Sequence, residues 1–313
     1  MEDYPRNQSE FERRFATEEA CREYLARLRW PEGFVCPRCA NRSSGRTRRG
    51  LLVCRRCRYQ ASVTAGTIFQ DSRKPLALWF HAIWAVTSFK TGASALAVQR
   101  VLGLGCYETA WTWLHKIRRA MVTPGREQLQ GEVEVDETFI GAPEEGRHGR
   151  RMTDRTMVVV AAEKDGRGIG RIRMRRVLDG SADSLHPFVK DSMVPGSTLL
   201  TDDWQGYAGL EGYRRKIKVI AHSGRTASQV MPRVHRVVSH LKRWLMGTHQ
   251  GAVSHEHLDY YLDEFTFRFN RRTSASRGKL FYRLLQNAVR VPPAPYHSMI
   301  KSVRGRKKRK HNL

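Results

Sequence analysis

Glu132-Val133-Glu134-Val135-Asp136-Glu137-Thr138-Phe139-Ile140-Gly141 is the stretch from which the architecture of this chain can be worked out. The valines at positions 133 and 135 alternate with acidic residues at 134 and 136. Such alternation predicts a β-strand with two unlike faces. Apolar residues upstream of residue 130 recur instead at three- and four-residue steps, so the pattern changes here from helices to strands.

Further elements follow this strand in a defined order. Strands are expected at 156–162, 172–178, 197–201 and 216–220, with a helix at 181–189 and long helices from residue 232 onward. Three strands, a helix, a strand, and then another strand and helices is the order of a ribonuclease-H-like fold. We therefore expect an α/β fold in this region, although fold order alone does not establish function.

A second acidic site follows the fourth expected strand, in Thr201-Asp202-Asp203-Trp204. An acidic pair at the end of an apolar strand needs a partner for its charge. Asp136 and Asp202, converging from neighbouring strands, would form a site for a hard cation such as Mg²⁺, which takes oxygen ligands. Such sites promote in-line phosphoryl displacements. On the residues alone, a turn that begins at Asp202 explains the pair equally well.

Four of the six cysteines form two Cys-x-x-Cys pairs, separated by fourteen residues. This spacing predicts a structural, tetrahedral Zn²⁺ site of the ribbon type. A disulfide framework is the alternative, but the N-terminus does not resemble a secretion signal, and a redox pair would not need a second copy. We expect Cys21 and Cys106 to be ordinary buried thiols and not zinc ligands. The zinc ligands are Cys36, Cys39, Cys54 and Cys57.

The chain has 56 Lys and Arg against 30 Asp and Glu, a formal net charge of +26. No stretch approaches 18 uninterrupted apolar residues, so no transmembrane helix is expected. So large an excess of charge indicates a polyanionic partner, nucleic acid in particular, whereas a merely solubilising surface would not need the charge to cluster. It clusters around the cysteines and in the C-terminal tail. The candidate DNA-binding residues in these two places are Arg48, Arg49, Arg55, Arg56, Arg306, Lys307 and Lys308.

Between the ribbon and the first strand the sequence predicts three helices, at 75–89, 94–102 and 107–121. Gly103-Leu104-Gly105 supplies a turn between the second and the third. Two short helices joined by a glycine-containing turn fit a helix-turn-helix, with Lys116 on a polar face as a candidate DNA contact. A plain three-helix core fits the same pattern.

Together, the cysteine pairs, the Glu134–Thr138 strand and Thr201-Asp202-Asp203-Trp204 resemble the IS1595 (ISXO2-like) family of insertion-sequence transposases. The resemblance continues through Leu241-Lys242-Arg243-Trp244, Gly247-Thr248-His249 and the segment 261–272, and it covers roughly residues 11–289 in the family's order. It implies a DDE-type recombinase: a zinc ribbon, a helical DNA-binding segment and a ribonuclease-H-like catalytic domain.

The resemblance also assigns catalytic positions. Asp136 and Asp202 match the family's first two aspartates, and the third acidic position falls at His235, seven residues before Lys242. Seven residues is close to two helical turns, so these two side chains share a helix face. Histidine departs from the carboxylate pattern and is a poorer Mg²⁺ ligand. His235 is thus expected to coordinate weakly, to position water or the scissile phosphate, or to favour Mn²⁺. Lys242, with Arg243 beside it, is expected to contact DNA phosphate.

These expectations define a domain plan and a function. The function is a metal-dependent transposase that cuts element ends and joins them to target DNA, acting on double-stranded DNA (terminal inverted repeats and target) as a homodimer or larger assembly in the cytoplasm, away from membranes. The alternatives are a non-enzymatic zinc-ribbon DNA-binding regulator and, last, an RNA-binding protein. The plan comprises an N-terminal helical segment (1–30), a zinc ribbon (31–70), a helical segment (71–125), the catalytic domain (126–292) and a basic tail (293–313).

Overall fold

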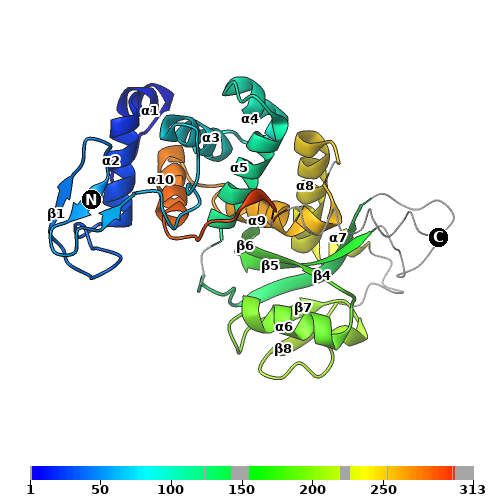
Figure 1. Cartoon of the computed structure of the whole chain (residues 1–313). Helices are drawn as coiled ribbons and strands as arrows, with labels where there is room; N and C mark the ends of the chain where they lie inside the picture. The colour runs from blue at the N-terminus through cyan, green and yellow to red at the C-terminus, as the bar shows by residue number, and fades with distance from the viewer. Residues whose placement is uncertain are drawn as a thin grey trace, which may run out of the picture. The chain divides into compact units, whose positions relative to one another are not determined.

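The computed structural model describes residues 2–122, 125–141, 155–218, 226–251, 253–297 and 299. The chain forms two compact units, Met1–Thr123 with Ser274–Leu313, and Pro124–Thr273. Figure 1 shows the elements of each unit coloured along the chain. None of the described helices is long and apolar enough to cross a membrane.

The first unit begins with two helices and a small antiparallel sheet. Side-chain oxygens of Asn7 and Thr17 accept backbone N–H bonds and so cap the two helices. In the sheet, β2 lies between β1 and β3, with Ser44 opposite Cys54. The cysteine knuckles flank this sheet as a ribbon requires. The elements are α1 (Gln8–Arg14), α2 (Glu18–Arg29), β1 (Ser44–Arg46), β2 (Leu52–Cys54) and β3 (Gln60–Ala61).

The first unit also contains the helices α3 (Leu76–Ser88), α4 (Ala95–Val101), α5 (Tyr107–Ala120) and α10 (Arg277–Ala288). The first three lie where the sequence predicts helices, with Gly103 at φ +61° in the turn after α4. Trp79 and Trp113 stack in the core at 4.1 Å between ring centroids.

Helix α10 belongs to this first unit, whereas the domain plan assigned its residues to the catalytic domain. Phe281 is fully buried against Phe11, Phe15, Phe80 and Trp84. An apolar stripe in a sequence shows that a helix is buried but does not identify the surface that it packs against.

The second unit is built on a five-stranded sheet with the order β6-β5-β4-β7-β8. Strands β4, β5 and β6 are antiparallel, while β7 and β8 run parallel to β4. Strand β8 ends earlier than the sequence predicts, and residues 219–220 of the expected strand lie outside the described part of the chain. The strands are β4 (Glu132–Ile140), β5 (Thr156–Asp165), β6 (Gly168–Val177), β7 (Thr198–Thr201) and β8 (Arg214–Ile217).

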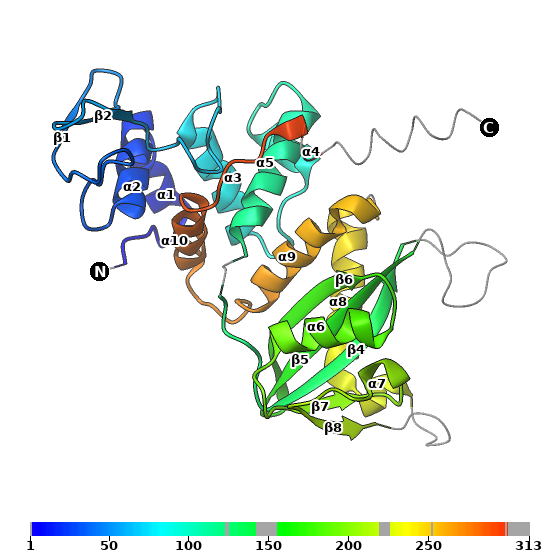
Figure 2. The same cartoon turned by 60° about the horizontal axis from the view of Figure 1, so that its bottom comes forward.

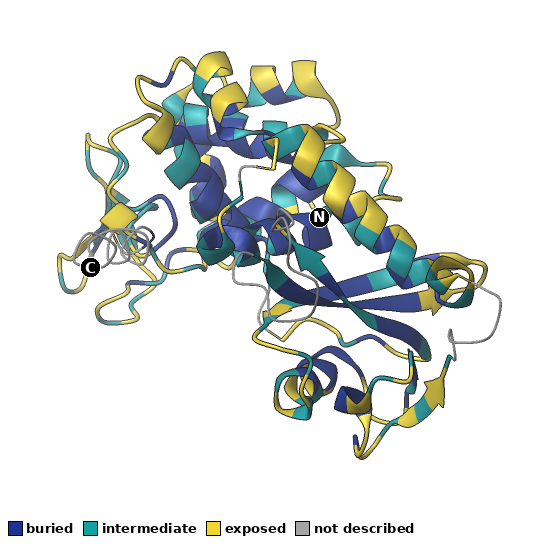
Figure 3. Cartoon of the chain, turned by 90° about the vertical axis from the view of Figure 1, so that its right-hand side faces the viewer, coloured by how far each residue is buried: buried dark blue, intermediate teal, exposed yellow. Residues whose placement is uncertain are grey.

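Helices cover both faces of this sheet, as Figure 2 shows with α6 (Ala182–Ser192) in front and α8 (Pro232–His249) behind. α8 and α9 (Leu258–Phe269) pack on the face that carries Val158 and Val160, and α6 packs on the face that carries Val133 and Val135. Figure 3 shows long buried segments in the central strands and exposed outward sides on the helices. This α/β arrangement is consistent with the expected ribonuclease-H-like fold. Shorter elements are η1 (Gln205–Tyr207), α7 (Ala227–Val230) and η2 (His255–His257).

Candidate active site and zinc ribbon

Asp136 and Asp202 lie at the same level of neighbouring parallel strands. Glu134 of β4 pairs with Leu200 of β7, so the two aspartates follow this pair by two residues each. Burial raises the pKa of Asp136 to about 6; the N–H of Glu137, which donates to Asp136 Oδ1, opposes this, and the charge of Asp202 adds to it. The two carboxylates therefore interact electrostatically.

His235, at the start of α8, reaches the same place. Its Nε2 is 3.4 Å from Asp136 Oδ2 and has no hydrogen-bond partner in the described part of the chain. Burial lowers the pKa of His235, although the charge of Glu134 opposes the shift. The neutral imidazole is therefore favoured. The structure thus places His235 against Asp136, whose carboxylate also interacts with Asp202.

Lys242 lies seven residues further along α8, about 10 Å along the helix axis. It is exposed, and its pKa is lowered by partial burial of the ammonium group and by the nearby charge of Arg155. Lys242 therefore lies on the same face of α8 as His235, about two turns further along the helix. Arg243 beside it is also exposed.

A third acidic residue, Glu137, lies near Asp136 and Asp202, and it was not assigned to the site from the sequence. Burial raises its pKa to about 7, the Tyr207 hydroxyl opposes this, and the charges of Asp136 and Asp202 add to it. Among the described residues, Glu137 Oε1 has no hydrogen-bond partner. The only signal in the sequence was its position next to Asp136.

Glu134 is a second residue that the sequence did not single out, and it joins β4 to α8. Its side chain is 3% exposed. Oε2 accepts the backbone N–H groups of Arg233 (2.7 Å) and Val234 (3.0 Å), and Oε1 accepts Arg233 Nη1 (2.9 Å). A carboxylate is favourable at a helix N-terminus, where backbone N–H groups lack helical partners. Because Glu134 and Asp136 share a strand face, this contact also places His235 against Asp136.

Arg215 of β8 supports the loop that carries Asp202. It donates to Thr201 Oγ1 (3.2 Å), to the Trp204 carbonyl (2.9 Å) and to the Asp202 carbonyl (3.3 Å). Asp202 Oδ1 in turn accepts the Trp204 N–H at 3.1 Å. Asp202 therefore begins a turn, and its charge also acts on Asp136, so the turn is compatible with the predicted metal site.

The oxygen donors fit a hard divalent cation. Among the described residues, only the four cysteines form a group of three or more possible ligand atoms lying within 4.8 Å of one another. Mg²⁺ does not need such an all-protein cage, because it keeps several waters and uses one or two carboxylates together with substrate phosphate. Asp136 and Asp202 supply such a pair.

The zinc ligands converge as the spacing predicts. The Sγ atoms of Cys36 and Cys57, and those of Cys39 and Cys54, lie 3.6 Å apart. A tetrahedral Zn²⁺ with Zn–S bonds of about 2.3 Å separates its sulfurs by about 3.8 Å. The Cys57 N–H donates to Cys54 Sγ and lowers the pKa of Cys54 to about 6, which favours the thiolate. All six cysteines lie in described residues and none forms a disulfide. Cys21 is buried as predicted, whereas Cys106 is exposed, because it precedes α5 at the surface.

The predicted DNA-binding residues differ in accessibility. Lys116 is half-buried near Asp71, and burial lowers its pKa, so it is less accessible than the arginines of the ribbon. The three basic residues of the tail lie outside the described residues. The exposed ones, from the ribbon, are Arg48, Arg49, Arg55 and Arg56.

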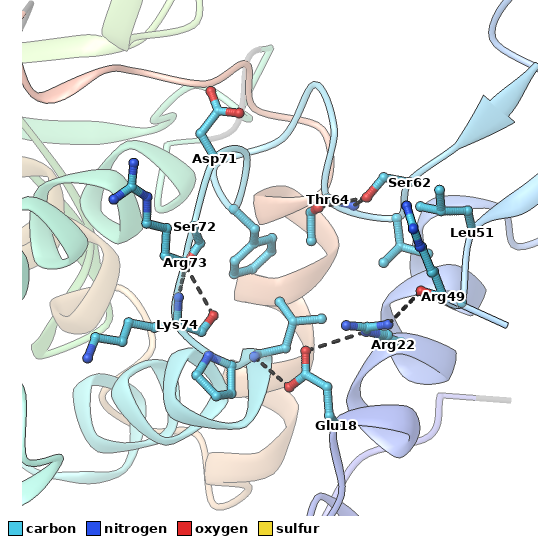
Figure 4. A pocket seen from close by; sticks show the side chains of 15 residues that line it. Glu18, Arg22, Arg49, Leu51, Ser62, Thr64, Asp71, Ser72, Arg73 and Lys74 are labelled. Carbon is cyan, nitrogen blue, oxygen red and sulfur yellow. Dashed lines mark hydrogen bonds and ion pairs between the residues drawn. The ribbon is translucent and has the colours of Figure 1, made fainter. Parts of the chain in front are cut away.

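A cavity of ≈450 Å³ in the first unit lies between α2, the ribbon turn and the segment before α3 (Figure 4). Glu18 accepts the N–H of Leu76 at the start of α3 and pairs with Arg22, which donates to the Arg49 carbonyl. The cavity thus contains contacts that fasten the ribbon turn to α3, and its lining includes none of the active-site carboxylates.

Comparisons with known proteins match both units. Residues 16–60 match the transposase zinc-ribbon domain and residues 128–270 match the ISXO2-like transposase domain. These ranges include the four cysteines, and Asp136, Asp202, His235 and Lys242. The chain is also 26% identical over 281 residues to an "uncharacterized protein in transposable element ISH50" of Halobacterium salinarum, covering 81% of this chain and 91% of that protein.

Proposed function

This chain belongs to the IS1595 (ISXO2-like) family of transposases, and from this premise we propose that it is a metal-dependent DNA transposase that cuts the ends of an insertion sequence and joins them to target DNA. The observation that carries the proposal is that Asp136 in β4 and Asp202 directly after β7 each follow the paired residues Glu134 and Leu200 by two positions, with His235 against Asp136. Carboxylates in this arrangement suit phosphoryl transfer.

Both reactions are in-line displacements at phosphorus. In cleavage, water attacks the phosphodiester and the 3′-oxygen leaves as a free 3′-hydroxyl. In joining, that hydroxyl attacks a target phosphodiester and a target 3′-hydroxyl leaves, so the number of ester bonds is unchanged. Asp136 and Asp202 would hold the divalent cation, which supplies activation of the attacking oxygen and stabilisation of the leaving one.

The remaining side chains orient the reactants. Neutral His235 accepts a proton or hydrogen bond at Nε2, where it would position the attacking water or the scissile phosphate. Lys242 and Arg243 would contact phosphate further along α8. The zinc ribbon would present exposed arginines to the backbone of double-stranded DNA, contacts that position the protein without reading sequence. Pairing two element ends would require at least a homodimer, acting on DNA in the cytoplasm.

The test is strand cleavage and joining on duplexes that carry the element's ends, with Mg²⁺ or Mn²⁺. Wild-type protein should produce a free 3′-hydroxyl and joined products, and Asp136→Asn should produce neither while still binding the duplex. Full activity of the Asp136→Asn protein would overturn the assignment.

A non-enzymatic DNA-binding regulator is the second candidate, and the observation that favours it is His235 at the position where a third carboxylate is expected. The same assay separates the two. Binding to a defined duplex without cleavage in either metal would support the regulator.

A further inference from the structure

Strand β8 is the edge of the catalytic sheet and is strongly basic. Arg214, Lys216 and Lys218 alternate along Arg214-Arg215-Lys216-Ile217-Lys218. Residues two apart on a strand share a face. The residues between them differ in kind: Ile217 is apolar, and the guanidinium of Arg215 is used by the loop that carries Asp202.

The strand register places this basic row on the active-site face of the sheet. Leu200 pairs with Glu134 on one side and with Lys216 on the other. One residue beyond the last paired position come Asp202 and Lys218, and the Lys218 N–H donates to the Thr201 carbonyl at 2.7 Å. In parallel strands, residues in register point to the same face, so Lys216 and Lys218 share a face with Glu134 and Asp136.

Electrostatics at β4 independently support this orientation. The pKa of Glu132 is lowered by its hydrogen bond to Lys164 and, to a smaller extent, by the charges of Lys216 and Lys218. Glu132 lies two residues before Glu134 and therefore on the same face of β4. The ammonium charges of Lys216 and Lys218 are therefore felt on the face of the sheet that carries Glu132 and Glu134.

Basic residues on an edge strand have another use, since lysines there prevent pairing with a second sheet edge. That use does not require the charges to lie on one particular face. Here they do, and the face is the one that carries the catalytic pair. The spacing also suits nucleic acid: alternate residues are about 6.6 Å apart along the strand, and β8 lies about 10 Å from β4.

We propose that Lys216 and Lys218, with Arg214 at their N-terminal end, form a phosphate-binding row for the DNA strand that enters the carboxylate site. This inference rests on the proposed function and names where substrate is held. Arg214 donates one N–H to the Gly196 carbonyl at 3.1 Å, which leaves other guanidinium N–H groups for phosphate. Lys216 is exposed and Lys218 is partly exposed.

The test measures binding of the full chain to a duplex without divalent metal, as a function of salt. Each lost phosphate contact reduces the slope of log K against log[salt] by about 0.9, so Lys216→Gln/Lys218→Gln should reduce it by about 1.8. Lys216→Arg/Lys218→Arg should retain the wild-type slope, because the charge is kept. The matched control is Arg167→Gln/Lys190→Gln, which removes the same charge from exposed positions of the same unit, on the β5–β6 turn and on α6.

A slope for Lys216→Gln/Lys218→Gln equal to that of the control would overturn the inference. The outcome is separable from that of the proposed function, because binding without metal does not depend on cleavage. A reduced slope for Lys216→Gln/Lys218→Gln, together with a wild type that never cleaves, would support the row and reject the transposase chemistry. Cleavage by the wild type with an unchanged slope would do the reverse.

Discussion

Replacing Glu134 by Ala should detach the first turn of α8 from β4. The carboxylate accepts three N–H groups at 2.7–3.0 Å and is 3% exposed. Removing one partner of a buried ion pair costs about 3–5 kcal/mol. The guanidinium of Arg233 also donates to the Gly168 carbonyl at 2.9 Å, which moderates the loss. We therefore expect a decrease in the free energy of unfolding near the lower limit, about 3 kcal/mol.

Glu132→Ala is the matched control. Glu132 lies on the same strand and face, but it is 35% exposed and pairs with exposed Lys164 at the surface. Loss of an exposed pair costs about 0–1 kcal/mol. Glu134→Gln is a second comparison, because it keeps the shape of the side chain and an acceptor oxygen but removes the charge.

The assay is amide hydrogen exchange of the full chain, followed at residues 233–236, together with denaturant unfolding of each variant. Glu134→Ala should exchange faster in this turn than wild type and lose strand cleavage, because His235 is no longer held against Asp136. Glu134→Gln should recover part of both. Identical exchange and unfolding in the Glu134→Ala and Glu132→Ala proteins would refute the reasoning.

Three further predictions concern other parts of the molecule. His235→Glu should retain or increase cleavage supported by Mg²⁺, since it adds the oxygen ligand that the ion prefers; collapse of activity with the fold intact would show that the imidazole itself is needed. Metal analysis should find one zinc ion per wild-type chain. Cys54→Ser should reduce this zinc content and unfold the ribbon; an unchanged zinc content would contradict the four-thiolate site. Burial raises the pKa of Asp263 to about 7, so its contribution to stability is greatest at low pH and is lost as pH rises toward 7. Denaturant unfolding should therefore show that, between pH 4 and 7, the free energy of unfolding of wild type falls by up to about 4 kcal/mol more than that of Asp263→Asn. Equal decreases in the two proteins would contradict a raised pKa at Asp263.

Patterns of neighbouring residues were sufficient to predict the strand β4 and the zinc ribbon. Alternating valines predicted β4, and cysteine spacing predicted a ribbon whose four thiols meet. The approach of His235 to Asp136 followed from the resemblance to a family, because the two lie 99 positions apart and no local pattern joins them.

What the sequence did not provide were partners across the fold. In the sequence, Glu134 resembles any polar residue of an alternating strand. No residue near it indicates that its carboxylate oxygens accept backbone N–H groups of α8, about one hundred residues later. Lys116 lies on a polar helix face yet is half-buried, because tertiary packing decides which polar faces remain open. The same limit applies to α10, whose apolar side does not reveal its neighbours.

The central claim is that Asp136 and Asp202 form the catalytic pair, and the rate of strand cleavage by Asp202→Asn relative to Asp203→Asn tests it most directly. The two aspartates are adjacent, but only Asp202 interacts with Asp136, while Asp203 is exposed. On a duplex carrying the element's end, with Mg²⁺ or Mn²⁺, Asp202→Asn should abolish cleavage and Asp203→Asn should cleave like wild type. Equal rates for the two variants, or loss only in Asp203→Asn, would contradict the account.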